Sequence, residues 1–292
     1  MKTYFDCIPC FVRQALDSAR MTTDDEQIQE KVMRKVLNLT SKMDLKQSPP
    51  AMARQIHRYI REVTGLEDPY FEVKNRFNKL ALQMYPELRK RVENSTDSLE
   101  TALRLAIAGN IIDFGINSHI EHSHVEKAIE ESLKASLDME ALELFRDEIK
   151  RAGQILYIGD NAGEIVFDRL LIEQLPCEKI TFAVRGGAIL NDVLIEDAQI
   201  VGLTDIVDVI DNGSDTPGII LEDCSDEFRR RFDEADMIIA KGQGNYETLS
   251  DIDKNIFFLV RPKCAVLARH LGSPIGSLVL AGTNHRKLTE RS

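Results

Sequence analysis

Gly159-Asp160-Asn161-Ala162-Gly163-Glu164-Ile165-Val166-Phe167-Asp168 is the segment of this chain that is most informative about its fold. It follows an apolar run at residues 155–158 and opens a segment whose apolar residues recur at helical spacing. A buried strand that leads directly into a helix is typical of an open α/β sheet, and ligands bind where such strands end. We therefore predict an α/β protein with a polar site at the carboxyl end of this strand.

Further short apolar runs predict the rest of the sheet. They occupy residues 180–184, 206–210, 237–240 and 256–260, and helical patterns or loops separate them. Strands that alternate with helices favour a mostly parallel, doubly wound sheet.

The first half of the chain has a different apolar period. Up to about Lys150, apolar residues recur three and four positions apart, for example around Val32, Phe77 and Leu103. This spacing predicts an all-helical region. We place a helical N-terminal subdomain at residues 1–145 and the sheet-based, metal- and phosphate-binding domain at residues 146–292. We expect the helical half to pack against the sheet and cover its site.

Composition and charge narrow the class of protein. The 292 residues carry a formal net charge of −11, and 43% of them are hydrophobic, so a large core is expected. No block of lysines and arginines suits a nucleic-acid duplex, and no apolar run approaches the ~20 residues of a membrane span. The five cysteines are an odd number, and no signal-peptide pattern is seen. We expect a soluble cytoplasmic protein whose partners include neither nucleic acid nor a membrane.

Polar residues follow several of the predicted strands. They include Asp160 and Asn161 after the first strand, Asn191 and Asp192 after Arg185-Gly186-Gly187, and Lys241 in the segment Lys-Gly-Gln-Gly-Asn. The carboxyl ends of parallel strands share one edge of a sheet, so these groups are expected to converge on one crevice.

Asp160, Asn161 and Asp192 form the candidate metal site. Two carboxylates and an amide oxygen, completed by water, suit Mg²⁺ or Mn²⁺, and the absence of histidine from these loops argues against zinc. The alternative is that the acidic residues cap the helices that follow them. The convergence of several polar strand ends favours the metal site.

Lys241 is a candidate for contact with an anionic ligand. It supplies a positive charge beside glycines that let the backbone approach a ligand closely. The Walker spacing of a P-loop is missing, and the alternative is a plain turn. Asn245 and Glu247, in the same segment, either bind substrate hydroxyls or order the loop.

Ala108-Gly109-Asn110-Ile111-Ile112-Asp113 interrupts the helical half. Asn110 and Asp113 are three positions apart and therefore share a helical face. Either this segment provides a helix–helix contact that needs a small residue, or the face reaches the crevice and contacts the substrate.

A single CxxC motif, Cys7-Ile8-Pro9-Cys10, stands near the N-terminus, and Cys264 follows the fifth predicted strand. The three thiols are candidates for a second metal site or a redox site. Ordinary buried thiols are the alternative, because there is no second CxxC and the motif precedes a helix.

Four motifs together resemble those of the damage-control phosphatase family, which is named after the human acidic-residue methyltransferase-like protein. They are Asp-Asn-Ala-Gly-Glu-Ile-Val-Phe-Asp from Asp160, Arg-Gly-Gly-Ala-Ile-Leu-Asn-Asp-Val from Arg185, Lys-Gly-Gln-Gly-Asn-Tyr-Glu from Lys241 and Ala-Gly-Asn-Ile-Ile-Asp from Ala108. The N-terminal CxxC is similar to that of the prokaryotic branch. The resemblance implies a helical N-terminal region on a three-layer α/β/α domain.

The resemblance also implies a chemistry. It implies a divalent metal (Mn, Co, Ni or Mg) held by Asp160, Asn161 and Asp192, with phosphate bound by Lys241. The implied substrate contacts are Asn110, Asp113, Asn191, Asn245 and Glu247. The implied activity is metal-dependent hydrolysis of phosphomonoesters of small metabolites, such as sugar phosphates. The resemblance assigns no role to the CxxC.

Two other functions stay open from the sequence. A methyltransferase that uses S-adenosylmethionine fits the glycine-rich strand ends but leaves the acidic site without a role. A non-catalytic metal or metabolite sensor would use Cys7, Cys10 and Cys264. Glu164 and Asp168 are both candidates for a general base, and the sequence determines neither the oligomeric state nor the substrate.

Overall fold

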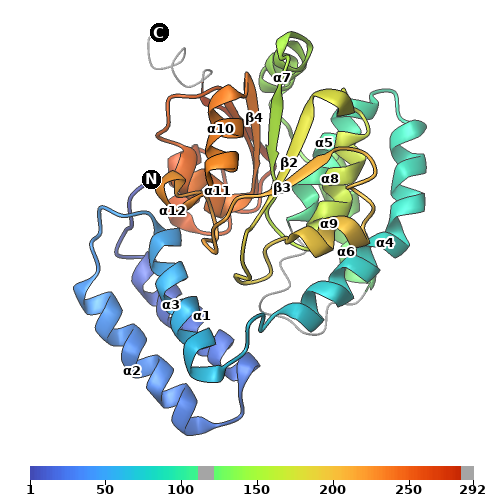
Figure 1. The fold of residues 1–292 in the computed structure, drawn as a ribbon. Coiled ribbons are helices and arrows are strands. Elements are labelled where there is room, and N and C mark those ends of the chain that lie inside the picture. The colour runs from blue at the N-terminus through green and yellow to red at the C-terminus, as the bar shows by residue number, and fades with distance from the viewer. Residues whose placement is uncertain (111–121, 284–292) are drawn as a thin grey trace.

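One six-stranded sheet in the order β3-β2-β1-β4-β5-β6 forms the centre of the molecule (Figure 1). The computed structural model describes residues 1–110 and 122–283, without the side chains of residues 122–124. The strands are β1 (Ile155–Ile158), β2 (Ile180–Val184), β3 (Asp208–Asp211), β4 (Met237–Lys241), β5 (Ile256–Val260) and β6 (Val279–Gly282). Strands β1 to β5 are parallel, and β6 pairs antiparallel with β5. The strand order reverses at β1 and β4, so the switch point of the sheet lies between their carboxyl ends.

The predicted strands at 155–158, 180–184 and 256–260 are confirmed with their bounds. The apolar run at 206–210 predicts a strand that starts too early, because Ile206 and Val207 donate backbone hydrogen bonds to the Leu203 carbonyl at 3.0 and 3.1 Å. These two residues therefore belong to a turn. Strand β6 has no counterpart among the predicted strands, since its sequence Val-Leu-Ala-Gly is short and ends in glycine.

The described helices lie on both faces of this sheet and at one end of it. They are α1 (Cys7–Thr22), α2 (Glu26–Lys42), α3 (Pro49–Thr64), α4 (Phe71–Glu93), α5 (Ser98–Gly109), α6 (His122–Lys134), α7 (Met139–Arg151), α8 (Glu164–Ile172), α9 (Ile195–Ile200), α10 (Asp226–Glu234), α11 (Gly242–Leu249) and α12 (Ala265–Leu271). Within the described ranges, no helix combines the length and the apolarity that crossing a bilayer requires.

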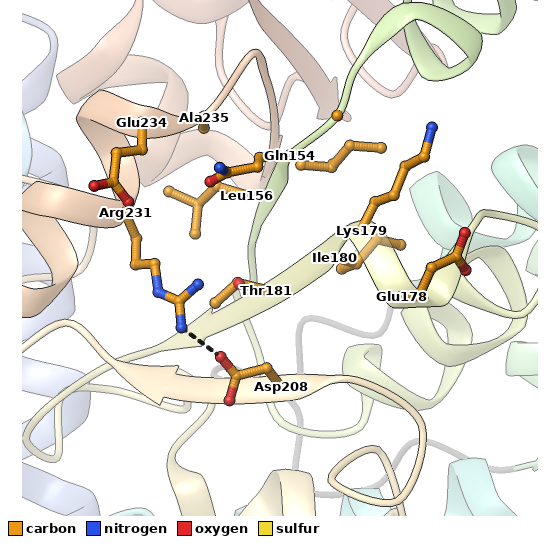
Figure 2. A pocket seen from close by; sticks show the side chains of 12 residues that line it. Gln154, Leu156, Glu178, Lys179, Ile180, Thr181, Asp208, Arg231, Glu234 and Ala235 are labelled. Atoms are coloured by element: carbon orange, nitrogen blue, oxygen red, sulfur yellow. Dashed lines mark hydrogen bonds and ion pairs between the residues drawn. The ribbon is translucent and has the colours of Figure 1, made fainter.

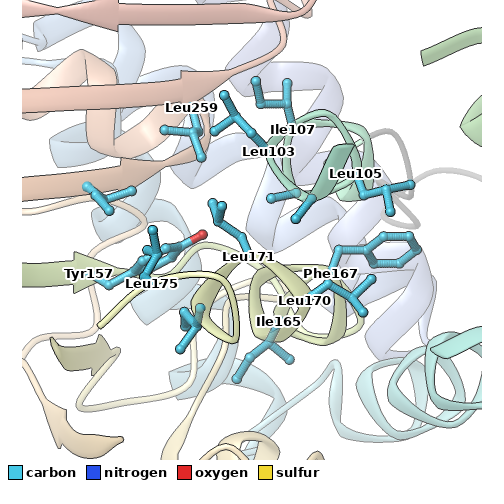
Figure 3. Packing of buried hydrophobic residues seen from close by; sticks show 14 of the residues in the cluster. Leu103, Leu105, Ile107, Tyr157, Ile165, Phe167, Leu170, Leu171, Leu175 and Leu259 are labelled. Atoms are coloured by element: carbon cyan, nitrogen blue, oxygen red, sulfur yellow. The ribbon is translucent and has the colours of Figure 1, made fainter. Parts of the chain in front are cut away.

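Alternate residues of each strand enter two separate hydrophobic clusters, one on each face. Tyr157 and Phe182 point toward α4 to α9, and Leu156 and Ile238 point toward α10 to α12. Figure 3 shows the first cluster, in which Leu103 and Ile107 of α5 lie near the side chains of α8. Strands that are buried on both faces are apolar throughout, which is why short apolar runs predict them. The predicted three-layer α/β/α architecture with a mostly parallel, doubly wound sheet is confirmed.

The helices of the first half pack in two groups. Helices α1, α2 and α3 enclose a small cluster of their own that includes Phe11, Val36 and Ile56. Helices α4 to α7 instead contribute to the large cluster on the sheet. In Figure 1, the first group lies at one end of the molecule, where α3 contacts α11. The division of the chain at residues 145 and 146 stays a prediction.

Candidate active site at the switch point of the sheet

Two segments that follow β1 and β2 pair with each other at the carboxyl edge of the sheet. The backbone N–H of Val193 donates to the Asp160 carbonyl at 2.9 Å, and that of Ala162 donates to the Asn191 carbonyl at 2.9 Å. Asn161 and Asp192 consequently form an antiparallel bridge. The two loops that carry the predicted metal ligands are therefore brought together.

The loop that carries Asp192 is closed at its base and strained near its end. The backbone N–H of Arg185 donates to the Val193 carbonyl at 3.0 Å. Leu190 has a φ of 48°, in the left-handed region that non-glycine residues rarely adopt. Such a conformation costs on the order of 1–3 kcal/mol and persists only where the surroundings impose it. The loop therefore holds Asn191 and Asp192 in a fixed position.

Two amide side chains join Asp160 to Glu164. The Nδ2 of Asn110 donates to Asp160 Oδ2 and to Glu164 Oε2, both at 2.9 Å. The Nδ2 of Asn161 donates to the same two oxygens at 2.7 and 2.9 Å. Asn110 stands at the end of α5, so the helical half of the chain reaches the site as predicted. A Cβ added to Gly109 would lie 3.0 Å from Cβ of Phe167, so this segment also makes a close helix–helix contact.

Lys241 lies beneath the site, in the interior. Its Nζ donates to Glu164 Oε1 at 2.7 Å, to the Ala106 carbonyl at 2.8 Å and to Asp168 Oδ1. Burial lowers the pKa of Lys241, but the carboxylates of Asp168 and Glu164 outweigh it and raise that pKa above the usual lysine value. An ammonium group has three N–H donors, and all three are used here. The predicted phosphate contact of Lys241 stays a prediction.

Arg185 is the residue of the site that the sequence analysis did not single out. Its Nε donates to Asp192 Oδ2 at 2.7 Å, its Nη2 donates to Asn245 Oδ1 at 3.1 Å, and Nη2 lies 3.9 Å from Asp160 Oδ1. The residue is only 1% exposed. The sequence held a signal for this residue. Arg185 is the first residue after a buried strand, and a buried guanidinium requires carboxylate or amide partners nearby.

The site holds more negative than positive charge. The carboxylates of Asp160, Glu164, Asp168 and Asp192 are all buried, as are the cations Lys241 and Arg185. With every carboxyl counted as ionised, four carboxylates against two buried cations leave a formal excess of two negative charges, which is the charge that one divalent ion neutralises. This donor set, with the amide of Asn161, fits a hard or borderline divalent cation.

Burial dominates the pKa values of these carboxyl groups. Burial, together with Glu164 and Asp192, raises the pKa of Asp160 well above its usual range. Burial raises the pKa of Asp192 to about 6 although Arg185 acts in the opposite direction. Burial likewise raises the pKa of Asp168 to about 6, against the effect of Lys241. In the described part of the chain, no three or more His, Cys, Asp or Glu side chains are arranged so that they could hold a metal ion together.

Lys263 is a second cation that the sequence analysis did not single out. It follows β5 at the carboxyl edge of the sheet and is exposed. Its positive charge lowers the pKa of Asp160, so the two groups lie within electrostatic range of each other. The signal in the sequence was that Lys263 comes shortly after the end of a predicted strand, at the edge of the sheet where the site was expected.

The remaining predicted substrate contacts have different positions. Asn191 lies in the closed loop beside Asp192. Asn245 is fully engaged, because its Nδ2 donates to the carbonyls of Gly159 at 3.1 Å and Lys241 at 2.7 Å while its Oδ1 accepts from Arg185. Asp113 lies outside the described residues.

Glu247 lies on α11, in contact with groups near the N-terminus. Its Oε1 accepts from Gln243 Nε2 at 2.7 Å, and its backbone carbonyl accepts from the amino group of Met1 at 2.8 Å. Burial raises the pKa of Glu247 to about 7, although the hydrogen bond from Gln243 acts in the opposite direction.

The raised pKa of Glu247 predicts a stability that falls with pH. The folded protein binds this proton more tightly than the unfolded chain, so stability decreases as pH rises from about 4.5 to about 7. The Glu247→Gln substitution removes the titration, and the variant should gain up to about 3 kcal/mol relative to wild type across that window. Urea unfolding at pH 4, 5.5, 7 and 8 measures this difference. Glu222→Gln, at an exposed position, is the control. The prediction would be contradicted if the difference in stability between the Glu247→Gln and wild-type proteins were the same at every pH.

The three thiols of the proposed second site lie within electrostatic range of one another. Cys7 and Cys10 occupy the first turn of α1, and Cys264 Sγ caps α12 and lies 3.9 Å from Gln243 Nε2. Burial, Glu247 and the neighbouring thiols raise the pKa of both Cys7 and Cys10. All five cysteines are free. A raised pKa favours the thiol over the thiolate that binds metal, and the metal or redox role stays a prediction.

Two cavities lie at opposite edges of the sheet. A cavity of about 380 Å³, shown in Figure 2, is lined by Gln154, Lys179, Asp208 and Arg231 at the amino ends of the strands, far from Asp160. A second, of about 360 Å³, lies at the carboxyl edge between Arg61 of α3 and Gly187, Ala188 and Asp215. Because Gly187 and Ala188 belong to the loop that carries Asp192, the second cavity is the one related to the candidate site.

The fold and the site together define a doubly wound α/β protein with a carboxylate-rich site at its switch point. A family model described as the damage-control phosphatase ARMT1-like domain matches residues 3–279. The chain belongs to this family, which confirms the resemblance of its motifs.

Individual relatives match along almost their whole length. A protein named damage-control phosphatase from Archaeoglobus fulgidus is 37% identical over 284 residues, which are 94% of this chain and 96% of that protein. Another protein named as a damage-control phosphatase, from Pyrococcus horikoshii, is 36% identical over 284 residues. The match covers 96% of this chain and 97% of that protein. An uncharacterized protein from Methanocaldococcus jannaschii is 39% identical over 287 residues, 94% of this chain and 93% of that protein.

A solved structure shares the fold. The crystal structure of a DUF89 family protein from Pyrococcus horikoshii has a TM-score of 0.87 and 35% identity, and the match covers 97% of this chain and 99% of that one.

Proposed function

We propose that this protein is a metal-dependent phosphatase that hydrolyses phosphomonoesters of small metabolites, such as sugar phosphates. Membership of the damage-control phosphatase family supports a phosphatase role in damage control. The observation that carries the metal dependence is the buried excess of two negative charges around Asp160 and Asp192. We also propose that the protein acts in the cytoplasm, with neither nucleic acid nor a membrane as partner. The net charge of −11 supports the absence of nucleic acid.

Asp160, Asn161 and Asp192 would hold the ion, which can be Mn²⁺, Co²⁺, Ni²⁺ or Mg²⁺. A divalent ion in such a site lowers the pKa of a bound water and polarises a phosphoryl oxygen. The chain's own groups have separate tasks. Asn110 and Asn161 orient the carboxylate of Asp160, and Lys241 holds Glu164 and Asp168 together beneath the site through a hydrogen bond to each.

The positive charge of Lys263 is suited to attract an anionic substrate to this edge. The non-phosphoryl part of the substrate would occupy the cavity of about 360 Å³ beside Gly187 and Arg61. Neither Glu164 nor Asp168 suits a general base, because each already accepts a hydrogen bond from Lys241 and is buried.

The two alternatives from the sequence have less support. A methyltransferase that uses S-adenosylmethionine has less support because the family model that matches residues 3–279 is described as a phosphatase domain. A sensor built on Cys7, Cys10 and Cys264 would need thiolates, whereas burial raises the pKa of Cys7 and Cys10.

Metal removal tests the proposal directly. Dialysis of the pure protein against a chelator should abolish phosphate release from a panel of phosphorylated metabolites. Addition of Mn²⁺, Co²⁺, Ni²⁺ or Mg²⁺ in turn should restore it, and the panel identifies the preferred substrate. Phosphate release that persists after chelation, with the metal content measured as zero, would rule out the metal dependence, and binding of S-adenosylmethionine seen by calorimetry would favour the methyltransferase.

A further inference from the structure

The cations of the site differ in how many donors they have left for a ligand. The three N–H donors of Lys241 go to Glu164, Asp168 and the Ala106 carbonyl. Arg185 uses Nε and Nη2 for Asp192 and Asn245, but its Nη1 is buried and has no hydrogen-bond partner among the residues that the structure describes. A buried donor without a partner costs about 1–3 kcal/mol, and a ligand that accepts a hydrogen bond from Nη1 would remove this cost.

The position of Arg185 relates this donor to the reaction. Its guanidinium contacts the carboxylate of Asp192 at 2.7 Å and lies 3.9 Å from that of Asp160, and these are the residues proposed to hold the metal. The Nδ2 of Asn191, in the loop that Arg185 and Val193 close, is also buried and lacks a partner in the described structure. Two unused donors are therefore located beside the pair of acidic residues.

We propose that Arg185 is the arginine that binds the phosphoryl group of the substrate, with Nη1 donating to a phosphoryl oxygen while Nε and Nη2 hold the guanidinium in place. Guanidinium groups suit this task because they stay charged and present several donors in one plane. The two fixed contacts orient the group before the substrate arrives, which reduces the entropic cost of binding. This inference rests on the proposed phosphatase function and adds a substrate-binding residue to it.

The test compares the affinity for inorganic phosphate in wild-type and variant proteins. In calorimetry with protein loaded with Mn²⁺, the Arg185→Lys variant should bind inorganic phosphate at least ~10-fold more weakly than wild type, because lysine cannot keep both fixed contacts and present a third donor. Its affinity for Mn²⁺, measured by electron paramagnetic resonance, should change by less than about threefold. Arg146→Lys is the matched control: its arginine, on α7, pairs with Asp97 and Glu143 away from the site.

The outcomes separate a ligand contact from a structural role. Unchanged phosphate affinity in the Arg185→Lys variant, or a loss confined to Mn²⁺ affinity, overturns the inference, as does a wild-type protein that binds no phosphate. A crystal structure of the wild-type protein with Mn²⁺ and inorganic phosphate gives an independent test if the variant does not fold. It should show a phosphate oxygen about 2.7–2.9 Å from Nη1. A wild-type protein that binds phosphate through Arg185 but hydrolyses no phosphomonoester would refute the proposed function and leave this inference standing.

Discussion

The Asp160→Asn variant is expected to lose metal-dependent phosphate release by a factor on the order of 10³ or more. Asparagine keeps the shape of the side chain but removes the charge that a divalent cation requires. It also places an NH₂ group or a neutral oxygen opposite the Nδ2 atoms of Asn110 and Asn161, both of which now donate to Asp160 Oδ2. Metal affinity should fall together with turnover. Steady-state kinetics with the best substrate of the panel, and metal titration of the same samples, measure both effects.

A matched control distinguishes this effect from a general loss of charge at the sheet edge. Asp211 ends β3 on the same edge and is exposed, and its Oδ1 accepts the local backbone N–H of Gly213 at 2.9 Å. The Asp211→Asn variant should stay within about twofold of wild type. A folded Asp160→Asn protein with wild-type turnover would remove Asp160 from the catalytic machinery.

The Gly242→Ala substitution is expected to inactivate the protein through the same carboxylate. Gly242 begins α11 with a φ of 76°, and a Cβ built there would lie 1.8 Å from Asp160 Oδ2. The carboxylate is tied to Asn110 and Asn161, so it cannot move aside without breaking the network. We expect a loss of activity of ~100-fold or more, in line with a misplaced catalytic group, and a loss of stability beyond the ~1–2 kcal/mol of the backbone conformation alone.

Gly272 provides the control for backbone strain. It caps the C-terminus of α12 with a φ of 65°, and a Cβ added there meets nothing within 4 Å. The Gly272→Ala variant should therefore lose only ~1–2 kcal/mol of stability and keep its activity. Thermal unfolding and kinetics on both variants make the comparison, and equal losses of activity in the two would show that contact with Asp160 is not the cause.

Much of the fold follows from local patterns. Strands β1, β2 and β5 were predictable because a parallel strand covered on both faces is apolar at nearly every position, with Thr181 of β2 the exception. The start of β3 was not predictable, because Ile206 and Val207 are apolar for packing while their N–H groups close a turn on Leu203. The edge strand β6 was missed since Val279–Gly282 has only three apolar residues and ends in glycine.

The four motifs of the sequence were enough to predict the family, and the strand pattern was enough to place Asp160, Asp192 and Lys241 at one edge of a parallel sheet. Only the tertiary structure decided how the charges are shared. It paired Lys241 with Glu164 and Asp168, placed Asn110 on Asp160 and directed Arg185 to Asp192. The physical reason is that apolar period and helix capping act between near neighbours in the chain, whereas a buried charge is satisfied by whichever group folding brings within hydrogen-bond distance. For Lys241, one such partner is the carbonyl of Ala106, which is 135 residues away in sequence.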